Sequence, residues 1–157
     1  AGASTTSTVM TTTAPVRPGV LASLRRTQCY GFCPTYELTI HEDGRVEYVG
    51  QEHVKTKGKD SATLDAAKLD ALRAAFRAAD YFALGDYPGD PKTDPTDGSS
   101  AELYYAEGGR AKVLRHYQSS RSAPPSVAKL EKEIDAIVGV EHWIGTDAER
   151  MELARKR

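Results

Sequence analysis

The chain has 157 residues, of which 39% are hydrophobic and 27% charged, and this composition is typical of a single globular domain with one core. Its 21 basic and 22 acidic residues give a formal net charge of -1, so nucleic-acid binding is disfavoured and no general attraction to an anionic membrane is expected. No apolar run approaches the roughly 18 residues that a membrane helix needs, so we predict no transmembrane segment.

Residues 1–18 consist mostly of Ser, Thr, Ala, Gly and Pro. Such a composition buries too little apolar surface to offset its ordering entropy, and we predict a flexible Ser/Thr-rich tether over residues 1–20. The segment lacks the basic start and the apolar stretch of a signal peptide, so we expect the signal of an exported protein to have been removed already. A lipoprotein-like tether is the favoured interpretation; an interdomain linker and a cloning remnant are the alternatives.

The first strand is predicted over residues 21–28, and apolar residues at alternate positions predict a second strand over residues 36–41. A turn follows at Glu42-Asp43-Gly44. A two-residue loop would split the apolar positions of the hairpin between two faces. A three-residue loop with Gly44 in the left-handed conformation instead pairs Ile40 with Val46 and Leu38 with Tyr48, and we predict that register.

A helical period begins after Thr63, which is placed to cap the helix, and Gly85 lies beyond its end. The apolar stripe of this helix is Leu69, Leu72, Phe76 and Ala79. The segment from Gly85 to Ser100 is rich in Pro, Gly and Asp and is predicted to be a loop. A second hairpin turns at Glu107-Gly108-Gly109-Arg110, and either a two- or a three-residue turn fits its pattern.

The last long helix is predicted to begin at Pro124-Pro125 and to end at Gly139. Its stripe is Val127, Leu130, Ile134 and Ile137, and Trp143 and Ile144 are expected to return to the core. Hairpins interrupted by helices predict an α+β fold, an antiparallel sheet of about five strands with two helices packed on one face. Residues 21–145 form the single domain, and residues 146–157 a charged tail that could form a frayed helix.

Several of these features together resemble a bacterial family known only as a domain of unknown function, with a C-[YF]-G-x-C-P-x-Y motif. They are the run Cys29-Tyr30-Gly31-Phe32-Cys33-Pro34-Thr35-Tyr36, the Asp43-Gly44 turn, the Gly109 hairpin that ends in Tyr117, and Pro124, Leu130, Ile134 and Trp143. The resemblance spans roughly residues 21–145. It implies a small domain of bacterial, often exported, proteins with no established activity, so it carries no catalytic residue over to this chain.

Cys29 and Cys33 are the only cysteines, four residues apart around a glycine and followed by a proline. In an exported protein two thiols this close are expected to oxidise, and the loop can bring their Cα atoms within the roughly 4.4–6.8 Å that a disulfide needs. We predict a structural disulfide. Because loop-closure entropy grows with ring size, so short a ring is expected to stabilise the fold by only about 2 kcal/mol.

A metal site is the sharper alternative, because two thiolates at this spacing could bind Cu(I) or supply half of a zinc site. In the predicted register Cys33 lies opposite His53 if pairing continues past Pro34, so the candidate ligands are Cys29, Cys33 and His53. Thiol redox exchange is a further alternative, but the spacing is longer than C-x-x-C and the segment that follows is a predicted strand rather than a helix.

Four aspartates of the predicted loop, Asp86, Asp90, Asp94 and Asp97, form the second candidate site. Their carboxylates could gather around Ca²⁺, although their spacing differs from that of an EF-hand. The structural alternative is favoured, because Asp is common in solvated turns.

From these observations we expect a noncatalytic bacterial domain that is exported, whether periplasmic, envelope-tethered or secreted. Its expected role is protein interaction or envelope assembly with a protein partner of the cell envelope. A thiol-dependent protein that binds copper or zinc or carries out redox exchange is the second hypothesis, and an enzyme the third. No cofactor is predicted.

Overall fold

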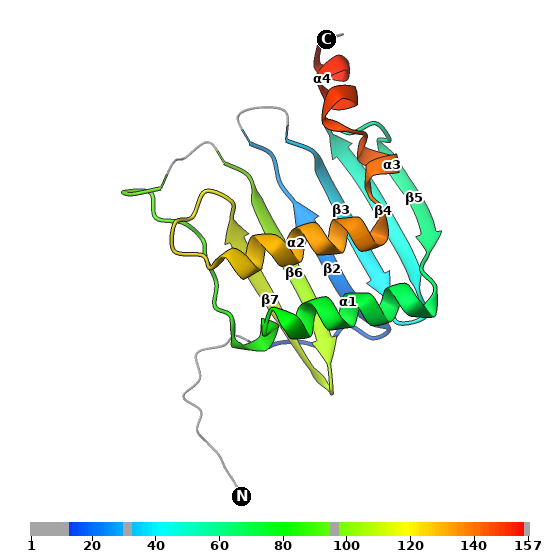
Figure 1. The fold of residues 1–157 in the computed structure, drawn as a ribbon, viewed down its shortest axis with the longest axis vertical. Coiled ribbons are helices and arrows are strands. Elements are labelled where there is room, and N and C mark those ends of the chain that lie inside the picture. Colours follow the sequence, from blue (N-terminus) through cyan, green and yellow to red (C-terminus); the bar gives the residue numbers. More distant parts are fainter. Residues whose placement is uncertain (1–12, 30–32, 95–97, 156–157) are drawn as a thin grey trace, which may run out of the picture.

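The computed structural model describes residues 13–29, 33–94 and 98–155, and within them a seven-stranded sheet carries two long helices on one face (Figure 1). The strands are β1 (Thr13–Ala14), β2 (Val20–Arg26), β3 (Thr35–His41), β4 (Arg45–Glu52), β5 (Gly58–Thr63), β6 (Ser100–Glu107) and β7 (Arg110–Tyr117). The helices are α1 (Ala66–Ala78), α2 (Pro125–Val138), α3 (Glu141–Ile144) and α4 (Asp147–Arg155), with a 3-10 turn at Tyr81–Ala83.

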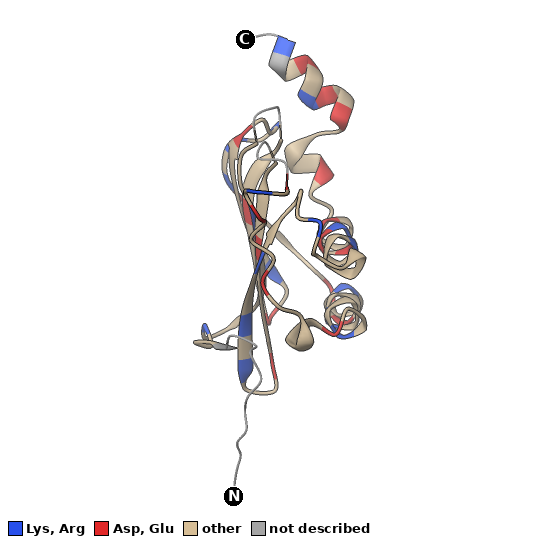
Figure 2. Ribbon diagram, turned by 90° about the vertical axis from the view of Figure 1, so that its left-hand side faces the viewer, with Lys and Arg blue, Asp and Glu red and all other residues tan. Residues whose placement is uncertain are grey.

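The strand order is β1-β7-β6-β2-β3-β4-β5, and every neighbouring pair is antiparallel. The edge-on view of Figure 2 places α1 and α2 together on one side of the sheet. The predicted α+β class is therefore confirmed, with a sheet somewhat wider than expected.

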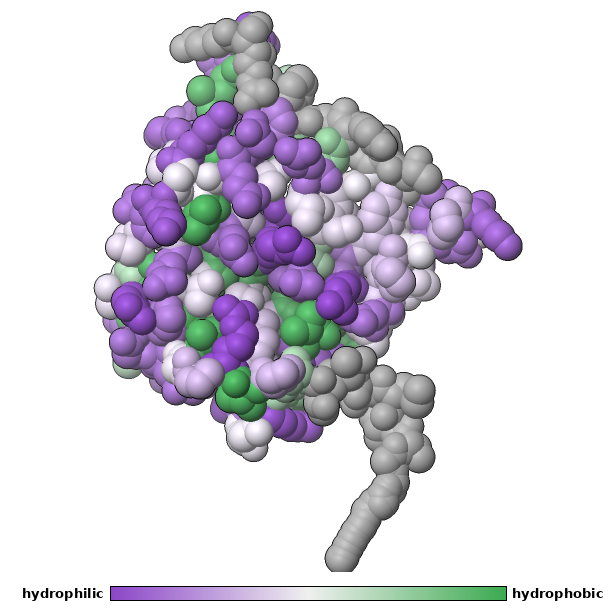
Figure 3. All heavy atoms as spheres, turned by 180° about the vertical axis from the view of Figure 1, so that it is seen from behind, coloured by the Kyte–Doolittle hydropathy of each residue, from purple (hydrophilic) through white to green (hydrophobic). Residues whose placement is uncertain are grey.

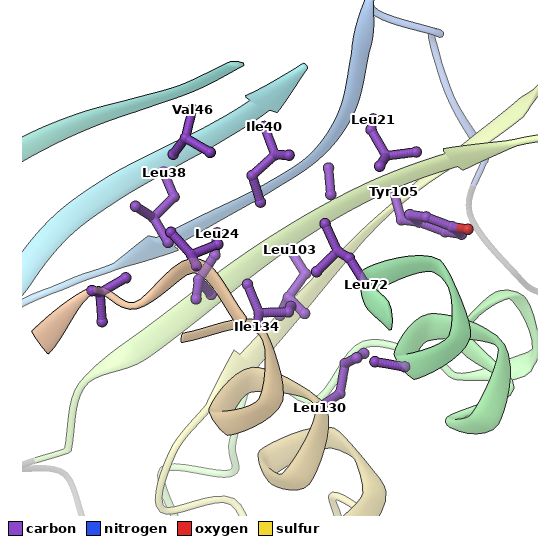
Figure 4. Packing of buried hydrophobic residues seen from close by; sticks show 14 of the residues in the cluster. Leu21, Leu24, Leu38, Ile40, Val46, Leu72, Leu103, Tyr105, Leu130 and Ile134 are labelled. Carbon is purple, nitrogen blue, oxygen red and sulfur yellow. The ribbon is translucent and has the colours of Figure 1, made fainter. Parts of the chain in front are cut away.

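The core lies between the inner face of the sheet and the two long helices (Figure 4). Leu24, Leu38 and Leu103 of the sheet are fully buried against Leu72 of α1 and Ile134 of α2. Each such side chain contributes roughly 1.5–3 kcal/mol when it is removed from water, so this layer is the main source of stability.

The first hairpin has the predicted register: Ile40 lies opposite Val46, and Leu38 opposite Tyr48. Gly44 has a φ of 96°, as expected for the left-handed residue of the turn, and a Cβ built on it would lie 2.4 Å from the carbonyl oxygen of Leu64. The glycine is therefore required both by its dihedral angle and by close packing.

The second hairpin has the shorter of its two possible turns. Glu107 pairs with Arg110, and Gly108 and Gly109 between them have φ values of 64° and 80°. Two central residues with positive φ are the mark of a type I′ turn, whose twist matches that of the flanking strands.

The start of the first helix differs from the prediction. Thr63 is the last residue of β5, and the helix is capped by Asp65, whose side chain accepts a hydrogen bond from the Lys68 amide at 2.9 Å. Strand β5 was not predicted, because all its residues except Ala62 are exposed and no apolar alternation marks it. At the other helix Pro124 and Gly139 take the predicted terminal positions, and Gly139 is left-handed.

The predicted tether extends too far along the chain, because its last residues contact the sheet. Ala14 of β1 pairs with Ala111 of β7, the Arg17 amide donates to the Tyr104 hydroxyl at 2.7 Å, and the Arg17 guanidinium lies over the Tyr104 ring. Residues 1–12 lie outside the described part of the chain. The outer face of the sheet is hydrophilic over much of its area, with several hydrophobic patches (Figure 3), and Val20, Tyr104 and Ala111 form a second, small cluster of buried residues apart from the main core.

The segment after α2 returns to the domain and then leaves it. Trp143 is 1% exposed, stacks on Tyr48 and donates its indole N–H to Asp60 at 2.9 Å. The predicted helix in the tail is present as α4, which projects beyond the sheet in Figure 1. Within the described residues, each helix is too short or too polar to cross a membrane.

Candidate functional site

Cys29 and Cys33 are joined in a disulfide, as predicted, with an S–S distance of 2.08 Å and Cα atoms 5.7 Å apart. Cys29 follows the end of β2 and Cys33 precedes the start of β3. The last residue pair of the β2–β3 ladder is Arg26 with Tyr36, so the disulfide lies just beyond this pair. It acts as a covalent clamp at the end of the hairpin where residues 27–34 connect β2 to β3.

The structure does not extend the ladder from Cys33 to His53. The β3–β4 pairing is shifted by one residue between Tyr36 and Thr35 and ends where Thr35 lies opposite Glu52. His53 itself has a φ of 57°, which turns the chain away from strand geometry. Both sulfurs are used in the disulfide, and in the described part of the chain no three His, Cys, Asp or Glu side chains lie close enough together to hold a metal ion.

A polar cluster that the sequence did not predict lies next to the clamp. Arg26 donates from Nε to the Tyr36 hydroxyl at 3.0 Å and from Nη2 to Asp135 Oδ2 at 2.7 Å. The Tyr36 hydroxyl donates in turn to Asp135 Oδ1 at 2.6 Å. A closed triangle of hydrogen bonds therefore joins β2, β3 and the last turn of α2.

Burial and the ion pair fix the protonation of this triangle. Burial by itself lowers the pKa of Arg26, but Asp135, Tyr36 and Glu131 together outweigh it and raise that pKa above the ordinary value. Burial and then Asp135 raise the pKa of Tyr36 far above its ordinary range. At neutral pH Arg26 is consequently a guanidinium cation and Tyr36 a neutral phenol.

The cluster continues under α2 through a buried carboxylate. Glu131, which is 1% exposed, lies 3.9 Å from Arg26 Nη1 and accepts a hydrogen bond from Gln118 at 2.9 Å. Its second oxygen lies at hydrogen-bond distance, 2.7 Å, from Nδ1 of His116, which is 3% exposed. Buried charges are costly unless they are paired, so these contacts hold α2 in one position over the sheet.

Arg26, Tyr36, Asp135 and Gln118 form the polar floor of a groove of about 1110 Å³, which we call the α2–α3 groove. It lies at the end of the sheet where β2 stops and β3 begins, and the second half of α2, the segment of α3 and the start of α4 surround it. Its apolar lining is Pro34, Ala136, Val140, Ile144 and Ala148, beside Cys33 of the disulfide. Its charged lining is Arg26, Lys132, Arg150, Asp135, Glu141 and Asp147.

The predicted aspartate site is not assembled by the described residues. Asp86 accepts from the Arg115 amide, and Asp90 accepts from the Lys92 amide. Asp94 accepts from the amides of Asp90 and Arg121 and so fastens the loop to the segment that follows β7. Asp97 lies outside the described residues. The carboxylates that are described bind backbone N–H groups, a typical role of Asp in turns.

A family model described as a domain of unknown function, DUF6438, matches residues 20–138. The chain belongs to the DUF6438 family. The match runs from β2 to the end of α2, so the disulfide and the Arg26–Tyr36–Asp135 triangle lie inside the DUF6438 domain, whereas α3 and α4 follow it. A search of curated proteins gave no match.

Proposed function

We propose that this DUF6438 domain is a noncatalytic part of an exported bacterial protein and binds an extended segment of a partner protein in the α2–α3 groove. The observation that carries the proposal is the groove itself, about 1110 Å³ in volume with a floor of polar groups that already bind one another. A preformed hollow with an apolar lining and a few fixed polar groups is typical of a binding site.

The groove is better suited to recognition than to chemistry. In the described part of its lining there is no histidine, and its cysteine is held in the disulfide. The Tyr36 hydroxyl is a weak candidate base or nucleophile, because burial and Asp135 raise its pKa far above the ordinary range. Asp135 is occupied by the guanidinium of Arg26.

The charges of the lining favour a polypeptide of low net charge as the occupant. Three cationic side chains, Arg26, Lys132 and Arg150, face three anionic ones, Asp135, Glu141 and Asp147. A balanced set attracts neither a polyanion nor a polycation, and the small apolar groups between the charges fit small apolar side chains. We therefore expect an extended segment with small, uncharged residues.

The disulfide supports the exported location, because disulfides persist in oxidising compartments and are rare in the cytosol. Both cysteines are partly exposed, so a reducing cytosol would have access to the bond. The tether fits the same role. Strand β1 pairs with β7 beside the Gly108-Gly109 turn, at the end of the strands opposite the disulfide, so a domain held by its amino end presents the groove away from the anchor.

Site-specific photo-crosslinking in bacterial cells that produce the protein tests this function. A photoreactive residue at Ala136, exposed on α2 and lining the groove, is compared with one at Ala71, exposed on α1 outside it. We expect a specific protein adduct from position 136 alone. A synthetic peptide that covers the crosslinked segment then binds the purified domain, and Ala136→Arg weakens that binding by tenfold or more, about 1.4 kcal/mol, whereas Ala71→Arg does not.

Equal adducts at both positions, or peptide affinity that Ala136→Arg leaves unchanged, would overturn the groove as the binding site. Intact mass after alkylation without reductant tests the compartment in the same cells. Two alkylated thiols in protein recovered from its native location would contradict export into an oxidising compartment.

A thiol-dependent role of Cys29 and Cys33 is the second candidate function, favoured by the partial exposure of both residues. It requires the disulfide to be reduced first, because metal ligation needs thiolates. Stoichiometric copper or zinc in the reduced protein, lost in the Cys29→Ser/Cys33→Ser variant, would support it. Absence of metal from the reduced protein at equimolar Cu(I) or Zn²⁺ would count against it.

A further inference from the structure

The disulfide and the polar triangle lie next to each other along both strands. Arg26 is the last residue of β2 and lies three residues before Cys29, and Tyr36 lies three residues after Cys33. Arg26 and Tyr36 are also directly opposite each other in the ladder. The disulfide therefore closes a short ring beyond the pair whose side chains together hold Asp135.

The contacts of this pair depend strongly on its geometry. Three hydrogen bonds of 2.6–3.0 Å require the guanidinium, the phenol and the carboxylate to keep one mutual position. At the end of a ladder the strands fray unless a turn or a cross-link holds them together. Residues 27–34 connect the two strands, and the disulfide closes this connection between Cys29 and Cys33, so that it restrains the β2 and β3 ends of the triangle more tightly than the chain alone.

We propose that the Cys29–Cys33 disulfide is a redox-sensitive latch that keeps the Arg26–Tyr36 pair in position to hold the carboxyl end of α2. A dithiol reductant opens the latch: it gives two electrons and two protons, the S–S bond breaks, two thiols form, and the reductant becomes a disulfide. With the latch open, the strand ends separate more readily and Asp135 loses its fixed partners. Cys33 and Pro34 also line the α2–α3 groove, so its wall loosens at the same time.

A double-mutant cycle tests the latch without any groove ligand. Tyr36→Phe removes the central hydroxyl of the triangle, and Cys29→Ser/Cys33→Ser opens the latch. If the disulfide and the triangle are coupled, Tyr36→Phe changes the unfolding equilibrium constant by a smaller factor in the disulfide-free protein than in the oxidised protein. We expect the two factors to differ by about fivefold, which is within the range for residues that share a network.

Tyr81→Phe is the matched control. Tyr81 is as buried as Tyr36, and its hydroxyl donates to the carbonyl groups of Leu103 and Lys112, away from the disulfide. Tyr81→Phe should change the unfolding equilibrium constant by the same factor in the oxidised protein and in the disulfide-free protein. Additive effects of Tyr36→Phe and the cysteine substitutions, within error, would overturn the proposal.

Amide hydrogen exchange of the native sequence gives a second measurement that needs no substitution. Reduction by a dithiol should speed exchange in the last turn of α2, around Asp135 and Val138, and leave the middle of α1 near Leu72 unchanged. Unchanged exchange at both places after complete reduction, or equal acceleration at both, would refute the latch. Neither measurement involves a partner, so the latch and the proposed binding function can fail separately.

Discussion

Removal of the Glu131 carboxylate tests whether the buried polar cluster stabilises the fold. Glu131 is 1% exposed, and its partners are His116, Gln118 and, at 3.9 Å, Arg26. Glu131→Ala removes one of the carboxylates near the Arg26 guanidinium, and it leaves His116 Nδ1 and the Gln118 amide without their carboxylate partner. Breaking a buried ion pair by removing one partner costs about 3–5 kcal/mol.

Glu131→Gln is the milder change, because the amide keeps its shape and one oxygen acceptor. We expect it to cost about 1–3 kcal/mol, the range for a buried donor that loses its acceptor. A domain of this size has a total unfolding free energy of only about 5–15 kcal/mol, so the alanine variant is expected to be marginally stable. The graded pair of variants keeps the result measurable even if Glu131→Ala does not fold.

The assay is urea unfolding followed by the fluorescence of Trp143, the single tryptophan, with the slope of the transition compared between variants. The control is Glu133→Ala on the same helix. Glu133 is partly exposed and pairs with Lys129 at 3.4 Å, so its loss should change the unfolding free energy by no more than about 0.5 kcal/mol. If the unfolding free energies of both Glu131 variants fall within about 0.5 kcal/mol of this control, the buried polar cluster does not stabilise the fold.

Three further predictions concern other parts of the fold. Gly44→Ala should lower the unfolding free energy by about 1–3 kcal/mol, because a left-handed φ and the Leu64 carbonyl oxygen oppose a Cβ; an unchanged melting temperature would contradict this. Hydrogen bonds from the Ser61 amide and then from Trp143 hold the pKa of Asp60 below its ordinary value. The stability that these bonds supply is therefore fully present above the unfolded-state pKa of about 3.9, and it is lost as pH falls through the lower pKa of the folded protein. Trp143→Phe should therefore flatten the acid loss of stability between pH 5 and pH 2, and an unchanged slope would refute the role of the indole. Burial, and then Asp60, raises the pKa of Tyr48 to about 12. The stability linked to Tyr48 is therefore fully present below about pH 10 and is lost between about pH 10 and 12. Ionisation of every tyrosine near pH 10, with a circular dichroism spectrum that shows an intact fold, would contradict this prediction.

Much of the fold follows from local patterns. The period of two in residues 36–48 and the Asp43-Gly44 turn allowed one register only, since a slip by one residue would have moved every apolar side chain to the outer face. Strand β5 carried no such pattern, because Lys59 and Asp60 lie at an exposed edge where neither face of the strand is buried deeply. A strand of this kind is formed by its hydrogen bonds to β4, which sequence periodicity does not report.

The disulfide was predictable because four residues separate its cysteines, whereas the neighbourhood of His53 was not. One extra residue on β4 near Gln51 shifts the register and ends the ladder before it reaches Cys33. A bulge of one residue has no strong signature in the sequence, yet it changes which side chains meet. The proposed Cys–His metal site depended on that single register step.

The α2–α3 groove depends on contacts between residues far apart in the chain, and this is why sequence reasoning missed it. Arg26 and Asp135 are separated by 109 positions. One local signal was present: Glu131 lies four residues after Val127 and three before Ile134, on the apolar side of α2, where a carboxylate needs a buried partner. The partner could not be named, because His116 and Arg26 come from strands whose order in the sheet only the fold determines. The cysteine motif marks the neighbourhood of the site, but the polar groups that give the groove its floor come from three elements, with Arg26 on β2, Tyr36 on β3 and Asp135 on α2.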